Sequence, residues 1–171
     1  MILQVAFIVN DARAKVFIVG PDFVPVLDAI AGDLTHTKKI VVIGGHPQHE
    51  SYESWVARYQ AVDPGGQPKT GDVAFQLYSS GTTGRPKGVM LTHHNIVSNI
   101  KALIRGKFFD LYASDRALSF LPLCHIYERT DVYMYMYYGV SVYYAESMET
   151  IADNIKEVKP AMFATVPRLL E

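Results

Sequence analysis

The sequence has few of the features that mark several large classes of protein. Its single cysteine, Cys124, excludes an internal disulfide and a metal site built from cysteines alone, and it suits a reducing compartment. Sixteen lysines and arginines balance seventeen aspartates and glutamates, with no long block of one sign. The chain therefore lacks the electrostatic signature of a nucleic-acid-binding protein. We expect a cytoplasmic protein with no nucleic-acid partner.

A hydrophobic run long enough to cross a bilayer is also lacking. The apolar opening, MILQVAFIVNDARAK, has no basic start and meets Asp11 and Arg13 too early. We expect no signal peptide, and nothing indicates association with a membrane surface. The mean hydropathy of +0.08 is nevertheless high for a chain of this size, and it is typical of a domain that other parts of a larger protein cover.

Short apolar β-prone runs alternate with amphipathic stretches, and this alternation predicts an α/β fold. At 171 residues and 49% hydrophobic, the chain can bury one sizeable core. Six runs rich in Val, Ile, Phe and Tyr are predicted as strands, enough for a core sheet: 15–19, 39–43, 73–78, 116–121, 140–145 and 161–166. Helices are predicted over 3–10, 22–30, 52–60, 93–104, 126–138 and 148–159.

Two local signals mark a predicted linker and the predicted start of a helix. Residues 62–72, VDPGGQPKTGD, hold two prolines and three glycines in eleven residues, so they predict a linker between two halves of the domain. Thr92 is a plausible N-cap for the helix over 93–104. That helix begins soon after a loop dense in glycine and hydroxyl residues.

This loop lies within QLYSSGTTGRPKGVMLTHHN, residues 76–95. It is not a Walker A loop, because neither Gly81 nor Gly84 begins the required spacing to a lysine and a hydroxyl residue. Pro86 also lacks an amide hydrogen and biases Arg85 away from helix. Since GVMLT follows as a β-like run, we predict a strand, a loop and a second strand.

Two interpretations of the loop are open on its residues alone. In the first, glycines let a phosphate approach the backbone amides and hydroxyls, and Lys87 adds a mobile positive charge. In the second, the segment is a solvated turn and Lys87 only faces water.

Two longer stretches favour the first interpretation. YSSGTTGRPKGVMLTH, residues 78–93, closely resembles the phosphate-binding signature of the AMP-forming adenylating enzymes, the superfamily of acyl-CoA synthetases, firefly luciferase and peptide-synthetase adenylation domains. Residues 117–171, above all LPLCHIYER and VPRLLE, resemble long-chain fatty acid CoA ligases. The resemblance is close from Asp72 onward, whereas residues 1–61 match only in general texture.

The resemblance implies part of the large N-terminal domain of an adenylate-forming enzyme. Such enzymes join a fatty acid to the α-phosphate of ATP, release pyrophosphate, and transfer the acyl group from AMP to CoA. It further implies Mg²⁺ as a cofactor, with a hydroxyl of Thr82 or Thr83 nearby. No catalytic residue is expected in this chain, because the family keeps its catalytic lysine in a separate C-terminal domain. The residues implied to hold the β- and γ-phosphates are Ser79, Ser80, Gly81, Thr82, Thr83, Gly84 and Lys87.

The segment PLCHIYER supplies candidate substrate residues. By resemblance, His125 lies beside the acyl site and orients the carboxylate; the alternative is a histidine that caps the following helix and packs against Tyr127. For Glu128 and Arg129, a role around the substrate stands beside an ion pair or a helix-end charge.

An aromatic run and a pair of histidines complete the candidates. In residues 131–145, DVYMYMYYGVSVYYA, Tyr and Met alternate from Tyr133 to Tyr137 as in a strand, but the apolar length of 126–138 and the resemblance favour a buried helix that ends at Gly139. We expect these side chains to pack in the core, with some Tyr and Met side chains as candidates to line an acyl channel. His46, His49 and Glu50 lack a further ligand at a usual spacing, so we interpret them as a polar loop and expect no metal site there.

The motifs expected for adenine, ribose and the catalytic lysine have no counterpart in these 171 residues. We therefore expect a fragment of a long-chain fatty acid CoA ligase that is inactive alone. The alternative is a free-standing, non-catalytic nucleotide- or acyl-binding module.

Overall fold

The computed structural model of the protein describes residues 2–79 and 84–166. By its contacts the chain divides into two compact units, residues 1–69 with 78–90 and residues 70–77 with 91–171. The boundary passes through both strands that flank the glycine loop. Each unit contains a parallel sheet and a hydrophobic cluster of its own.

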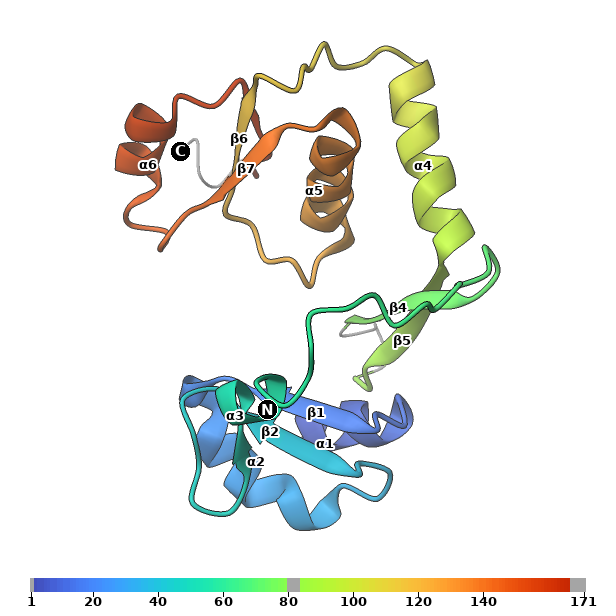
Figure 1. The fold of residues 1–171 in the computed structure, drawn as a ribbon, viewed down its shortest axis with the longest axis vertical. Coiled ribbons are helices and arrows are strands. Elements are labelled where there is room, and N and C mark those ends of the chain that lie inside the picture. The colour runs from blue at the N-terminus through green and yellow to red at the C-terminus, as the bar shows by residue number, and fades with distance from the viewer. Residues whose placement is uncertain (1, 80–83, 167–171) are drawn as a thin grey trace. The chain divides into compact units, whose positions relative to one another are not determined.

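The first unit is built on a parallel sheet in the order β1-β2-β3 (Figure 1). Val16 of β1 pairs with Lys39 of β2, and Val19 pairs with Val42. Valines at the strand ends and Leu27 form a buried cluster, which holds one helix against the sheet. Its elements are α1 (Ile2–Asp11), β1 (Val16–Val19), a 3₁₀ turn (Pro21–Phe23), α2 (Val24–Ile30), a second 3₁₀ turn (Ala31–Asp33), β2 (Lys39–Val42), β3 (Glu50–Ser51) and α3 (Tyr52–Val56).

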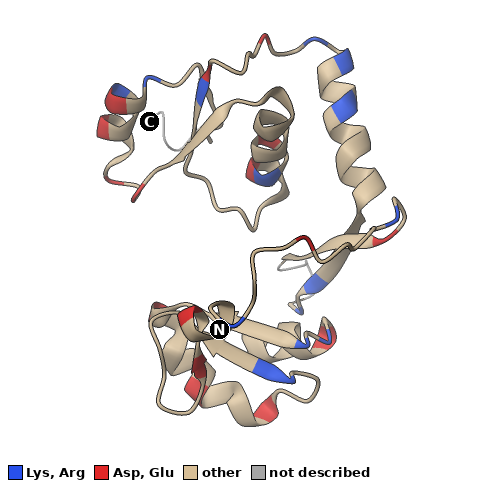
Figure 2. Ribbon diagram, in the orientation of Figure 1, with Lys and Arg blue, Asp and Glu red and all other residues tan. Residues whose placement is uncertain are grey.

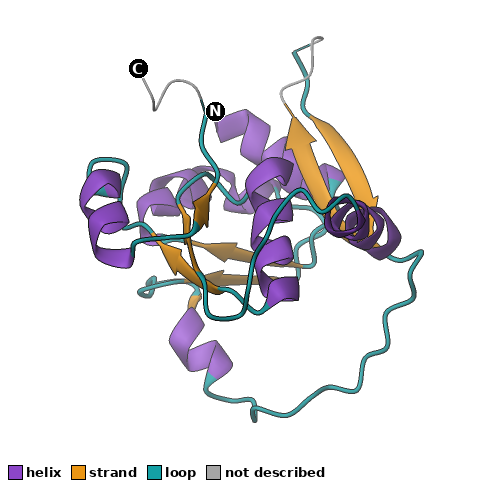
Figure 3. Cartoon of the chain, turned by 90° about the horizontal axis from the view of Figure 1, so that it is seen from above, coloured by secondary structure: helices purple, strands orange, loops and turns teal. Residues whose placement is uncertain are grey.

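Helix α3 is shorter than the predicted 52–60. The Ser51 side chain accepts a hydrogen bond from the Ser54 amide at 3.1 Å and caps its start, but the helix ends at Val56. Both Tyr52 and Val56 remain exposed, and a helix this short needs a packed face in order to extend. Residues 57–72 contain neither helix nor strand, and they include the predicted linker 62–72 (Figure 3). Its role as a linker stays a prediction.

Strands β4 (Val73–Ser79) and β5 (Lys87–Thr92) form a two-stranded sheet. They lie on either side of the glycine loop, so the predicted order of strand, loop and strand is confirmed. Pro86 stands directly before β5, where its missing amide hydrogen interrupts no helix.

The second unit is built on a parallel sheet in the order β7-β6-β8 (Figure 1). Each neighbour runs parallel to the central strand, which requires a crossover connection, and a helix supplies it in both cases. A buried cluster of Leu111, Ala117, Met134, Tyr135 and Val140 joins the sheet to one of these helices. The elements are α4 (His93–Arg105), β6 (Arg116–Ser119), α5 (Ile126–Tyr138), β7 (Ser141–Tyr144), α6 (Ile151–Val158) and β8 (Met162–Phe163).

The boundaries of α4 and α5 follow from local sequence. Thr92 and Asn95 form a capping box, with the Asn95 amide donating to Thr92 Oγ1 at 3.1 Å and the Thr92 amide donating to Asn95 Oδ1 at 3.0 Å. Helix α5 ends at Gly139, whose φ of +73° is the left-handed conformation that glycine adopts without strain. The predicted N-cap, Thr92, and the predicted helix over 126–138 are both confirmed.

The α/β fold is confirmed, but one expectation about the sheet is wrong. All six predicted strands occur, yet in the described residues they belong to three separate sheets. Strand periodicity is a local property, whereas the choice of pairing partner depends on segments far apart in the chain. The last predicted strand, 161–166, is reduced to Met162–Phe163 because only these residues pair with β6.

Basic and acidic residues are interspersed along the ribbon in both units (Figure 2). Large apolar side chains are exposed in both units as well, among them Leu3 at 82% and Phe108 at 70%. Among the residues that the structure describes, no helix has the length and apolar character needed to span a bilayer.

Candidate functional site

The glycine loop is described at its two edges. Ser79 ends β4 and is exposed, and Gly84 has a φ of +84°. A residue with a Cβ would be strained in that backbone conformation, so the structure gives a physical reason for glycine at position 84. The predicted phosphate ligands Ser80, Gly81, Thr82 and Thr83 lie outside the described residues.

Lys87 is the charged group of this loop. It begins β5 and is exposed, and its ammonium group has no hydrogen bond or ion pair with another described residue. An ammonium group on a flexible stem without a protein partner is able to reach an anion beside the loop. Ser79, Gly84 and Lys87 all belong to the first unit.

In the second unit, the structure brings the two predicted substrate residues to one cavity. This cavity, which we call the His125 cavity, has a volume of about 510 Å³. Its wall combines the turn before α5, the first turn of that helix and the segment after β8. It is lined by Leu121, Pro122, His125, Ile126, Tyr127, Glu128 and Val166.

His125 occupies the N-cap position of α5 and is exposed. Its amide donates to the carbonyl oxygen of Pro122 at 2.9 Å, which closes the turn that carries it. The imidazole makes no capping hydrogen bond. The structure therefore does not show the alternative in which the His125 side chain caps the helix. The ring remains available to the cavity.

Glu128 is neither an exposed helix-end charge nor part of an ion pair among the described residues. Glu128 is 1% exposed, and its Oε2 atom has no hydrogen-bond partner in the described part of the chain. Burial raises the pKa of this carboxyl, and a hydrogen bond with Ser119 of β6 opposes the rise. Among the described residues the ion pair considered for Glu128 is absent, and although Glu128 lies in the first turn of α5, its carboxyl is buried there.

Two further buried polar groups were missed in the sequence. Asp131 is 6% exposed and Tyr135 is fully buried, and Asp131 Oδ2 and the Tyr135 hydroxyl both lack partners in the described chain. Burial, reinforced by the neighbouring Glu128, raises the pKa of Asp131 to about 6. Burial and then the charges of Asp131 and Glu128 raise the pKa of Tyr135. Residues 128, 131 and 135 are three and four residues apart, which places them on one face of a helix. This spacing was the sequence signal that could have indicated a cluster of polar groups.

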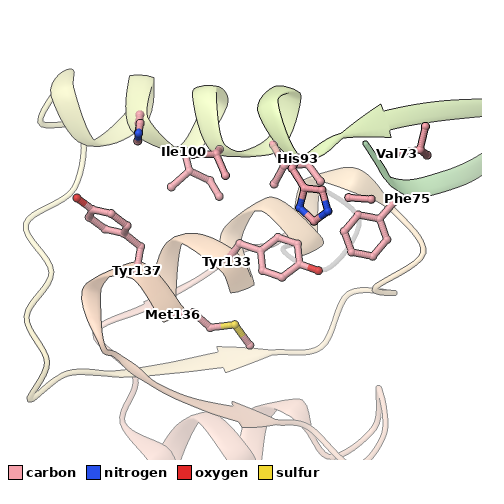
Figure 4. Close-up of a pocket in the computed structure, with 11 residues that line it drawn as sticks. Val73, Phe75, His93, Ile100, Tyr133, Met136 and Tyr137 are labelled. Atoms are coloured by element: carbon pink, nitrogen blue, oxygen red, sulfur yellow. The ribbon is translucent and has the colours of Figure 1, made fainter. Parts of the chain in front are cut away.

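A second cavity, of about 590 Å³, lies between α4 and α5 and has a mostly apolar wall (Figure 4). Figure 4 shows Tyr133, Met136 and Tyr137 of α5 opposite Ile100 of α4, with Phe75 of β4 at one end. Met134 and Tyr135, by contrast, are buried in the core. The aromatic run thus serves both the core and a cavity, but the role of the cavity in binding an acyl chain stays a prediction.

His46 and His49 form a polar cluster within the first unit. His46 Nε2 lies 2.9 Å from Asp28 Oδ1, its Nδ1 accepts from the Gln48 amide at 3.1 Å, and its ring stacks on His49 with centroids 4.8 Å apart. No group of three or more His, Cys, Asp or Glu side chains placed to hold a metal occurs within residues 2–79 and 84–166.

Comparison with known proteins identifies relatives along the whole chain. The family model described as AMP-binding enzyme matches residues 3–171. Long chain acyl-CoA synthetase 7, peroxisomal, of Arabidopsis thaliana is 34% identical over 96% of this chain and 25% of its own length. Long-chain-fatty-acid–CoA ligase 1 of Cavia porcellus is 32% identical over 97% of this chain and 26% of its own length.

Solved structures agree with these relatives. The anthranilate CoA ligase AuaEII in complex with anthranoyl-AMP has a TM-score of 0.87 and 28% identity, covering 98% of this chain and 34% of that one. The N-terminal domain of FACL13 from Mycobacterium tuberculosis, with a bound inhibitor, has a TM-score of 0.86 and 27% identity over 99% of this chain and 42% of that one.

The chain spans about a quarter of the length of the curated relatives described above. Within that span the family model matches from residue 3 to residue 171, and the strand, glycine loop and strand lie inside the match. The protein therefore belongs to the family of AMP-binding enzymes.

Proposed function

We propose that this chain is part of an AMP-forming long-chain fatty acid CoA ligase, in which it provides the phosphate-binding loop and part of the acyl pocket. The reaction converts ATP, a fatty acid and CoA to acyl-CoA, AMP and pyrophosphate through an acyl-adenylate. The observation that carries the proposal is the match to long-chain acyl-CoA synthetases along 96% of the chain, together with a glycine loop whose lysine has no partner in the described chain.

The loop would hold the leaving group of the first step. Attack of a carboxylate on the α-phosphate of ATP builds up negative charge on the departing pyrophosphate. Backbone amides and hydroxyls from Ser79 to Gly84, with Lys87, would neutralise that charge while keeping the leaving oxygen aligned. The left-handed backbone at Gly84 and the ammonium group of Lys87, which has no partner among the described residues, support this role.

The His125 cavity would receive the carboxyl end of the fatty acid. Its wall is mainly apolar, and His125, which lines it, would donate a hydrogen bond that orients the carboxylate. Glu128 also belongs to the wall of this cavity, but its carboxyl is almost inaccessible. It would therefore support the wall from within the core. The cavity between α4 and α5 supports the further proposal that the alkyl chain packs against Tyr133, Met136 and Tyr137.

Magnesium and CoA belong to the same proposal. Mg²⁺ is commonly held by substrate phosphates with few protein ligands, which fits a loop of hydroxyls and amides better than a carboxylate cage. A hydroxyl of Thr82 or Thr83 would be its protein contact. Bound magnesium supplies charge neutralisation at the phosphates. The cytoplasm is our proposed compartment, in keeping with the free, exposed Cys124.

The test uses the complete encoded protein, in whatever length it occurs. We expect palmitate-dependent exchange of labelled pyrophosphate into ATP. Lys87→Ala should raise the apparent Kd for ATP about tenfold, because one charge-assisted contact with phosphate is lost. Calorimetry with ATP measures this, and Lys156→Ala, which changes an exposed lysine of α6, is the matched control.

The outcomes separate the two functions considered for the chain. ATP or acyl binding without any exchange, over a series of fatty acids of different length, would favour the non-catalytic binding module. Equal ATP affinity in the Lys87→Ala and Lys156→Ala variants would remove the loop from the nucleotide site. Exchange with fatty acids, lost in Lys87→Ala, would support the ligase.

A further inference from the structure

Arg129, in the first turn of α5, makes three different contacts within the second unit. Its Nε donates to the carbonyl oxygen of Leu123 at 2.8 Å, and its Nη1 donates to the hydroxyl of Tyr133 at 3.4 Å. Its guanidinium carbon lies over the ring of Phe75, 4.4 Å from the centroid. Phe75 and Tyr133 are themselves in contact, with ring centroids 5.9 Å apart.

These contacts join two adjoining segments, the turn before α5 and the helix itself, to a strand that is far away in sequence. Leu123 lies in the turn that leads to His125, Tyr133 lies one turn further along α5, and Phe75 lies in β4, the strand that ends at the glycine loop. The turn is closed by a hydrogen bond that the His125 amide donates to the Pro122 carbonyl oxygen at 2.9 Å. Arg129 is thus the side chain that ties this turn to the body of α5 and to β4.

An arginine is chemically suited to this arrangement. The planar guanidinium places hydrogen bonds along its edge while its face stacks on an aromatic ring, so one group satisfies a carbonyl, a hydroxyl and a π-system together. A lysine ammonium is a compact charge that does not offer an edge and a face in fixed geometry. Arg129 forms no ion pair with Glu128 or with any other described carboxylate, so its position is set by these three contacts.

We propose that Arg129 is a positioning residue, which fixes the turn of residues 122–125 against β4 and thereby holds His125 where it orients the fatty acid carboxylate. The inference rests on the proposed function for the role of His125, but the structural part stands by itself. Arg129 does not line the His125 cavity, so it acts on the substrate through the turn.

The experiment compares Arg129→Met and Arg129→Lys in the complete encoded protein. Methionine keeps an apolar stem of similar reach and removes the charge and the donors. Lysine keeps the charge and can satisfy only part of the contacts. Arg105→Met is the matched control, since Arg105 is an exposed arginine at the end of α4. Phe75→Leu removes the stacking partner while leaving the guanidinium, in case the Arg129 variants fold poorly.

The first measurement is hydrogen exchange at the His125 amide. We expect exchange at least about tenfold faster in Arg129→Met, an intermediate rate in Arg129→Lys, and a smaller increase in Phe75→Leu. Arg105→Met should exchange as the wild type does. An unchanged rate in Arg129→Met would overturn the proposal, whatever the enzyme does.

The second measurement is the kinetics of palmitate-dependent pyrophosphate exchange. We expect the KM for palmitate to rise about tenfold in Arg129→Met, with the KM for ATP within about twofold of wild type and partial recovery in Arg129→Lys. An equal rise of both KM values would indicate general destabilisation and overturn the positioning role. If the wild-type protein shows no pyrophosphate exchange into ATP with any fatty acid, the proposed function fails. The hydrogen exchange rates of the His125 amide still decide whether Arg129 positions the turn.

Discussion

The two faces of helix α5 hold their charged groups in opposite ways. On one face, which we call the cavity face, Arg129 lies with Tyr133, Met136 and Tyr137. Its guanidinium donates hydrogen bonds to a carbonyl oxygen and a hydroxyl, and its positive charge lies over an aromatic ring. On the opposite core face, Glu128, Asp131 and Tyr135 are buried, and each has an oxygen atom without a partner in the described chain.

The difference shows two solutions to the cost of removing a charge from water. Arginine stays protonated in proteins, so it must be provided with partners wherever it is half-buried. A carboxyl can instead take up a proton and lose its charge, and the raised pKa values of Glu128 and Asp131 have this direction. The cavity face is therefore held by specific contacts, whereas on the core face burial favours the neutral form of the two carboxyls.

The largest expected effect comes from removing a core-face ring. Tyr135 is fully buried among Leu111, Ala117, Met134 and Val140, so Tyr135→Ala should cost about 3–5 kcal/mol of unfolding free energy. Urea denaturation measures the loss. The control, Tyr137→Ala on the exposed cavity face, should change stability by less than about 1 kcal/mol.

The same position offers a sharper variant. Tyr135→Phe keeps the ring and removes only a buried hydroxyl that has no partner in the described chain, so stability should stay equal or increase. A loss of more than about 1 kcal/mol would mean that the hydroxyl is hydrogen-bonded in solution.

A smaller effect, dependent on pH, is expected at Asp131. Its folded pKa of about 6 lies above the ordinary value of 3.8, so the folded state binds the proton more tightly than the unfolded state. The stabilisation from the protonated carboxyl is complete below pH 4 and is lost as the pH rises through about 6. Asp131→Asn, which imitates the neutral form, should raise Tm by about 3 °C at pH 8 and much less at pH 4.

Thermal unfolding followed by circular dichroism at several pH values tests this expectation. Asp153→Asn is the control, because the Asp153 side chain is 82% exposed and lies in a surface ion pair. A shift in Tm for Asp131→Asn that is the same at pH 4 and pH 8 would contradict protonation of the core face.

The smallest effect is expected on the cavity face. Tyr133→Phe removes one of the three contacts of Arg129, and that hydrogen bond is long at 3.4 Å. We expect a loss of less than about 0.5 kcal/mol in urea denaturation, since Leu123 and Phe75 still hold the guanidinium. A larger loss would show that the hydroxyl is a principal partner of Arg129.

The helices with strong local signals could be predicted from the sequence. Helix α5 occupies the predicted residues, which were expected from the apolar length between Ile126 and Tyr138 and from the family resemblance, and Gly139 supplies the left-handed end. Thr92 begins α4 through a capping box that involves only residues close in sequence. In α3 the predicted end was wrong, because its length depends on a packed face that it does not acquire.

The sequence also determined the family, since the glycine loop and the LPLCHIYER segment are local strings that the family model matches. It could not determine that the strands pair in three sheets, that Glu128 and Asp131 lose contact with water, or that Arg129 reaches Phe75. Each of these depends on segments distant in the chain: a carboxyl is buried only when a sheet covers it, and Arg129 meets Phe75 only when β4 lies beside α5. Tertiary structure therefore decided which residues of α5 are buried in the core and which line a cavity, because burial depends on the segments that pack against the helix.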